Sequence, residues 1–177
     1  MTNKPKILLA DVSRTALSAI DNHLREHGCE TVIAADGVEA ILVACRDLPD
    51  CIVLELGTPV IGGYQACRFL KRRREISKIP VILTGPAESE PLCRWNRSNQ
   101  PDAFVAKDGN YAAALYREIV ALLDHAAPDP AIAEADAADL SERSIFAFVS
   151  EFVEDQLLHA TIRNRLAVLG NAPDLEA

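Results

Sequence analysis

Five short runs of apolar and β-branched residues recur along the first two-thirds of the chain, separated by polar, glycine and proline positions. Each run is nearly continuous in its hydrophobic character, which is typical of strands covered on both faces of a parallel sheet. We therefore predict strands at residues 6–10, 31–35, 51–56, 80–84 and 103–107.

Segments with helical periodicity alternate with these runs. The first can be capped by Ser13 and ends at about His27, just before Gly28. Further helices are predicted at 38–47, 64–74 and 111–123, whereas 87–100 shows little regular apolar periodicity. Strands and helices in this order predict an α/β fold, a doubly wound five-stranded parallel sheet with right-handed crossovers.

The composition changes after His125. Residues 126–138 are rich in Ala, Pro and acids, and we interpret them as a linker between a domain at 1–125 and a helical extension at 139–177. The extension contains one long helix with a broad apolar stripe, which must be buried against something. We predict that it pairs two copies into a homodimer through the residues Ile145, Phe148, Val149, Phe152 and Ile162. The alternative is that the helix folds back onto its own domain.

Charge is distributed unevenly along the chain. The net charge is −8, yet the first 120 residues carry 15 acids and 15 bases, so the excess lies in the C-terminal part. An acidic tail is repelled by phosphates, and the basic run 71–74 suits the end of a helix, so we expect no nucleic acid partner. No apolar run is long enough to span a membrane, and the five cysteines contain no C-x-x-C pair. These features favour a cytoplasmic protein with reduced thiols.

Four polar side chains stand at or just after the ends of the predicted strands: Asp11, Glu55, Thr84 and Lys107. The carboxyl ends of parallel strands meet at one edge of the sheet, so we expect these groups to converge there. Two acids, a hydroxyl and an ammonium suit a phosphoryl group or a cation. The four histidines have no nucleophile placed beside them, and no phosphate-binding glycine motif occurs, so no enzyme activity is predicted.

From Lys6 to about Leu123 the pattern resembles the receiver domains of two-component response regulators, which have a flavodoxin-like fold. KILLADVSRT resembles the first strand and acidic loop, PDCIVLELGTPVIGGYQACRFLK the phosphoacceptor strand and third helix, and KIPVILTG and DAFVAK the last two strands. In that family an Asp at the end of the third strand takes a phosphoryl group from a histidine kinase, with the help of a metal ion. The resemblance assigns the switch positions to Thr84 and Phe104.

The chain departs from the family pattern at the pocket. The phosphoacceptor position is Glu55, and the second member of the acidic pair after Asp11 is Val12, so one metal ligand is missing. Lys107, Thr84 and Phe104 match the family pattern, but Asp108 stands where a proline usually follows the lysine. We therefore expect Mg²⁺ binding to be weak or absent and phosphorylation at Glu55 not to occur. The prediction is a pseudo-receiver that signals through protein contacts, with a histidine kinase or a downstream effector as its partner.

Three alternatives stay open. Glu55 either mimics the phosphorylated state or merely pairs with Lys107 in a site that has drifted. The domain could instead be phosphorylated at Glu55 or a neighbouring acid. The chain could also be the regulatory front part of a longer signalling enzyme.

Overall fold

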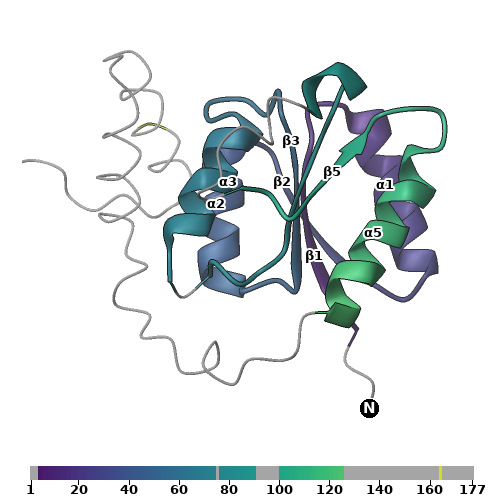
Figure 1. Ribbon diagram of the computed structural model, residues 1–177, viewed down its shortest axis with the longest axis horizontal. Coiled ribbons are helices and arrows are strands. Elements are labelled where there is room, and N and C mark those ends of the chain that lie inside the picture. Colours follow the sequence, from purple (N-terminus) through teal and green to yellow (C-terminus); the bar gives the residue numbers. More distant parts are fainter. Residues whose placement is uncertain (1–3, 75, 91–99, 126–163, 165–177) are drawn as a thin grey trace, which may run out of the picture.

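A computed structural model describes residues 4–74, 76–90, 100–125 and 164, and within them a five-stranded parallel sheet forms the centre of the molecule (Figure 1). The strand order is β2-β1-β3-β4-β5, so the direction of winding reverses between β1 and β3. The strands are β1 (Lys6–Ala10), β2 (Glu30–Ala34), β3 (Cys51–Glu55), β4 (Val81–Gly85) and β5 (Ala103–Ala106). The predicted fold class is confirmed, and the strand boundaries differ from the prediction by one residue at some ends.

Helices cover both faces of the sheet. In Figure 1, α1 (Arg14–Glu26) and α5 (Tyr111–His125) lie on one side, and α2 (Gly37–Asp47) and α3 (Gly63–Arg72) lie on the other. Within the ranges that the structure describes, no helix has both the length and the apolar character to cross a membrane.

Local capping explains where the first helices begin. Ser13 caps α1 by accepting a hydrogen bond from the Ala16 amide at 3.2 Å, as predicted. The α2 helix begins with an N-cap: the Asp36 carboxylate accepts from the Glu39 amide, and the Glu39 carboxylate accepts from the amide of Ala35, the residue before the cap, both at 2.9 Å. Sequence analysis started this helix one residue later because it did not identify this cap.

Side-chain alternation along the strands divides the core into two clusters. Leu8, Ile52 and Leu83 pack on the α2 and α3 side, and their immediate neighbours Ile7 and Val53 pack on the α1 and α5 side. Fully burying one such side chain contributes about 1.5–3 kcal/mol to folding. Successive side chains of a strand point to opposite faces of the sheet, and this alternation also decides on which face the residues just after each strand lie.

Several predictions fall outside the described residues. Residues 126–138 and the dimerisation stripe at 145–162 are among them, so the linker, the helical extension and the homodimer stay predictions. In the fourth crossover a short 3-10 helix, η1 (Ala87–Ser89), is described, while residues 91–99 are not.

Val60, in the loop between β3 and α3, has a φ of 67°, in the left-handed region that strains a β-branched residue. We expect Val60→Gly to raise the free energy of unfolding by about 0.5 kcal/mol, because relief of strain exceeds the sum of the entropy that glycine adds to the unfolded chain and the partial packing of Val60 against the core that is lost. Urea denaturation measures the change. The control is Val12→Gly, at a valine whose φ is not positive, which should lower stability; a loss at both positions would contradict the strain argument.

Candidate functional site

The polar residues at the strand ends converge on one face of the sheet. Asp11 follows Ile7 and Leu9 in alternation, and Glu55 follows Cys51 and Val53, and these apolar residues all pack on the α1 and α5 side. Thr84 and Lys107 follow Ile82 and Val105 on the same side by the same spacing. The sheet therefore brings all four predicted pocket residues to a single edge, as sequence analysis expected.

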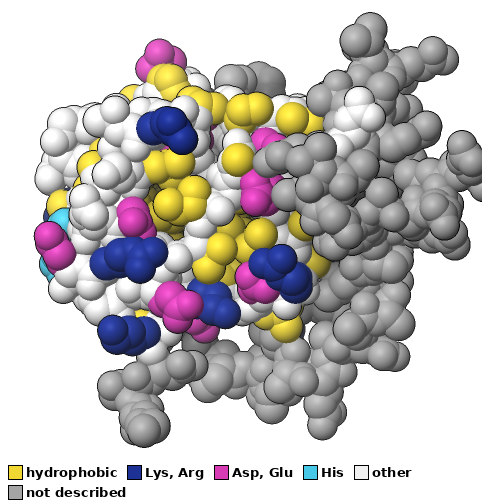
Figure 2. All heavy atoms as spheres, turned by 180° about the vertical axis from the view of Figure 1, so that it is seen from behind, with side chains coloured by type: hydrophobic (Ala, Val, Ile, Leu, Met, Phe, Trp, Pro, Cys, Tyr) yellow, Lys and Arg dark blue, Asp and Glu magenta, His cyan; other side chains and the backbone are white. Residues whose placement is uncertain are grey.

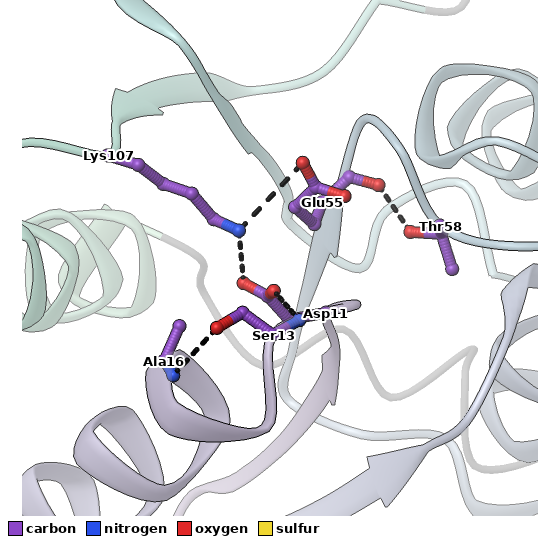
Figure 3. A network of polar contacts seen from close by, with 6 residues as sticks. All are labelled: Asp11, Ser13, Ala16, Glu55, Thr58 and Lys107. Carbon is purple, nitrogen blue, oxygen red and sulfur yellow. Dashed lines mark hydrogen bonds and ion pairs between the residues drawn. The ribbon is translucent and has the colours of Figure 1, made fainter.

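An ion-pair network joins three of them (Figure 3). The Lys107 Nζ atom lies 2.7 Å from Asp11 Oδ2 and 3.8 Å from Glu55 Oε1. Asp11 and Glu55 are each only 8% exposed, and among the described residues Lys107 is the cation that compensates both carboxylates. With all three groups ionised, the cluster has a net charge of −1.

Asp11 is held in place by the start of α1. Its Oδ1 atom accepts a hydrogen bond from the Ser13 amide at 2.8 Å, and Ser13 in turn caps the helix (Figure 3). One Asp11 oxygen thus orders the loop, and the other contacts Lys107. Val12, which lies between Asp11 and Ser13 in the sequence, is 52% exposed and turns its apolar side chain toward solvent.

The loop after β3 accommodates the longer acid at position 55. The Thr58 hydroxyl donates to the Glu55 carbonyl oxygen, which fixes the turn (Figure 3). A Cβ atom at Gly57 would lie 3.0 Å from Glu55 Oε2, so the glycine leaves the space into which this oxygen extends. Sequence analysis treated Glu55 by itself and did not connect it with Gly57, because that contact depends on the path of the loop.

The two switch-equivalent residues lie on opposite faces of the sheet. Thr84 is fully buried on the α1 and α5 side, and its hydroxyl has no hydrogen-bond partner among the described residues. Phe104 pairs in register with Leu83 on β4 and packs against the cluster on the α2 and α3 side. The sequence predicted both positions but not their separation by the sheet.

Tyr111, the first residue of α5, is a pocket residue that sequence analysis missed. Burial raises the pKa of its phenol, the negative charges of Asp11 and Glu55 raise the pKa further, and a hydrogen-bonding effect of the Thr84 hydroxyl lowers it. The phenol therefore stays protonated well above pH 10. Its signal in the sequence is only a tyrosine four residues after Lys107.

Among the described residues, the pocket offers a divalent metal ion the carboxylates of Asp11 and Glu55. Mg²⁺ requires hard oxygen ligands in near-octahedral geometry, but Val12 supplies none, and the Lys107 ammonium already contacts Asp11. Within the part of the chain that the structure describes, no group of three or more His, Cys, Asp or Glu side chains is arranged to hold a metal ion.

Comparisons with known proteins agree with the geometry. A sequence profile of the response regulator receiver domain matches residues 7–124. The chain is similar to Protein PilH of Pseudomonas aeruginosa, with 28% identity over 102 residues that make up 58% of this chain and 84% of PilH.

Solved receiver domains have the same fold. The signal receiver domain of a histidine kinase from Syntrophus aciditrophicus superposes with a TM-score of 0.62 at 27% identity, over 75% of this chain and 99% of that one. The receiver domain of a sensor histidine kinase from Pseudomonas aeruginosa, solved with magnesium in its active site cleft, gives a TM-score of 0.61 at 25% identity, over 69% and 99%.

Proposed function

The chain belongs to the response regulator receiver domain family, and from this premise we propose that it is a pseudo-receiver, which signals through protein contacts without phosphorylation of Glu55. The observation that carries the proposal is the pocket itself, where one ammonium compensates two buried carboxylates and Val12 stands in place of a third acid. A phosphoryl group would add negative charge to a cluster that already has an excess of it.

The length of the Glu55 side chain supports the same proposal. One additional methylene moves the carboxylate outward by roughly 1.5 Å relative to Asp. In phosphoryl transfer the protein contributes mainly positioning and electrostatic stabilisation, so a displacement of this size impairs in-line attack. Gly57 favours the displaced position because it leaves room for the Glu55 carboxylate.

The contacts of Glu55 favour a drifted site over a mimic of the phosphorylated state. A mimic would engage both Lys107 and Thr84, but Lys107 lies closer to Asp11 than to Glu55. Glu55 Oε2 and the Thr84 hydroxyl are both without a hydrogen-bond partner among the described residues. We infer that Glu55 supplies a fixed charge and does not reproduce the three acceptor oxygens of a phosphoryl group.

We also infer that the output is contact with another signalling protein, a histidine kinase or a downstream effector, in the cytoplasm. Figure 2 shows acidic and basic side chains interspersed over the described part of one face. Such a mixed surface supports a protein partner over a nucleic acid, which favours a broad basic patch.

Incubation of the full-length protein with a small-molecule phosphodonor and Mg²⁺ tests the proposal. We expect no phosphoprotein by intact-mass spectrometry, and calorimetry should show Mg²⁺ binding weaker than about millimolar because a carboxylate ligand is missing. A phosphorylated Glu55, a phosphorylated neighbouring acid or tighter Mg²⁺ binding would favour the working phosphoacceptor instead. A receiver domain known to be phosphorylated serves as the positive control for the donor.

A further inference from the structure

Two hydroxyl groups are buried in the pocket without a completed hydrogen bond. Thr84 is 0% exposed, and neither its Oγ1 atom nor the Tyr111 Oη atom has a hydrogen-bond partner among the described residues. Leaving such a group unsatisfied costs about 1–3 kcal/mol, so buried polar atoms normally find a partner. The pair therefore needs an explanation that the ion-pair network does not give.

The fold brings the two hydroxyls together. Alternation along β4 places Thr84 on the same side as Ile82, and the Tyr111 ring packs against the cluster that contains Ile82. The Thr84 hydroxyl is close enough to lower the pKa of the Tyr111 phenol, although the contact stays short of standard hydrogen-bond geometry. The other unpartnered buried oxygens of the described pocket belong to the carboxylates of Asp11 and Glu55, and of these Glu55 pairs in register with Thr84 on the neighbouring strand.

The turn after Lys107 explains why Tyr111 reaches the pocket. The Asp108 amide donates to the Ala106 carbonyl at 3.0 Å, and the Asn110 amide donates to Asp108 Oδ1 at 2.9 Å. The Tyr111 amide then donates to the Asp108 carbonyl at 3.2 Å, and α5 begins at this residue. An Asx turn of this kind starts the helix close to the strand end, so its first side chain packs beneath the pocket.

The protonation state of the phenol suits this role. Burial and the charges of Asp11 and Glu55 keep Tyr111 neutral, so it supplies an O–H donor that adds no charge to the cluster. The threonine hydroxyl can accept that hydrogen and rotate its own toward a carboxylate.

We propose that Tyr111 is a positioning residue that acts as an internal ligand of the pocket: its hydroxyl pairs with that of Thr84 and fixes the threonine against the first turn of α5. Thr84 is then held by the protein itself, and the orientation of α5 is coupled to the edge of the sheet through one phenol. This inference goes beyond the proposed function, because it concerns Thr84 and not the chemistry of Glu55.

Tyr111→Phe tests the pairing, because it removes one oxygen and keeps the ring. We expect the Thr84 methyl resonance to shift in methyl NMR spectra, and amide exchange in the first turn of α5 to accelerate about fivefold, as loss of one ordinary hydrogen bond predicts. The matched control is Tyr116→Phe in the same helix, whose ring centroid lies 4.4 Å from that of His27. It should leave Thr84 unchanged.

A second variant tests the pairing from the threonine side, in case the side chains around position 111 rearrange in Tyr111→Phe. Thr84→Val removes the hydroxyl from the other side, and it should accelerate amide exchange in the first turn of α5 about as much as Tyr111→Phe does. Because the two changes remove the same hydrogen bond, the double variant should exchange no faster than either single variant. An unmoved Thr84 resonance in Tyr111→Phe, or fully additive effects in the double variant, overturns the pairing.

Discussion

Val12→Asp combined with Glu55→Asp is expected to turn the pocket into a magnesium-dependent phosphoacceptor. The first change restores a carboxylate ligand and a negative charge, which should tighten Mg²⁺ binding by roughly tenfold or more. The second withdraws the carboxylate toward the strand, and correcting a displacement of about 1 Å can be worth on the order of a hundredfold in rate. Calorimetry measures the binding, and intact-mass spectrometry after treatment with a phosphodonor measures the transfer.

The single variants separate the two effects. Val12 is 52% exposed, so an Asp there should not disturb the core, and Val12→Asn controls for polarity without charge. We expect Val12→Asp alone to bind Mg²⁺ more tightly but to be phosphorylated inefficiently. Glu55→Asp alone should bind Mg²⁺ weakly and should also be phosphorylated inefficiently. Full phosphorylation by Glu55→Asp alone would show that the absent acid at position 12 is not what disables the site.

The sequence predicted the structure well wherever the spacing of apolar residues along a short segment is enough to determine it. The near-continuous apolar runs placed all five strands, and a period of two along each strand carries Asp11, Glu55, Thr84 and Lys107 to a common face. Their meeting at one edge follows from parallel topology alone. Local patterns of this kind need no knowledge of distant contacts.

Features that depend on the path of a loop could not be predicted in the same way. Tyr111 enters the pocket because an Asx turn begins α5 four residues after Lys107, and the sequence does not specify where such a turn directs a ring. Gly57 makes room for Glu55 only because the loop folds back over it. The unequal distances from Lys107 to the two acids are likewise a product of tertiary packing, and our proposal of a drifted site draws on them.

Lys107→Met is expected to be the most damaging single substitution in the pocket. The Asp11 and Glu55 side chains are 4% and 10% exposed, and Lys107 is the cation that contacts both. Removing one partner leaves buried charge without compensation, which typically costs 3–5 kcal/mol. Because the Lys107 side chain is itself 22% exposed, we expect the lower end, about 3 kcal/mol, in the free energy of unfolding measured by urea denaturation.

A second-site change distinguishes lost charge compensation from lost packing. Asp11→Asn in the Lys107→Met background should recover most of the stability, because it removes the carboxylate nearest to the ammonium. An amide oxygen at position 11 can still accept the hydrogen bond from the Ser13 amide, so the start of α1 is preserved. Lys4→Met, at an exposed position, changes the net charge equally and should have little effect. If the double variant is no more stable than Lys107→Met, the lysine stabilises the domain through its aliphatic stem, and the pocket does not depend on it for charge.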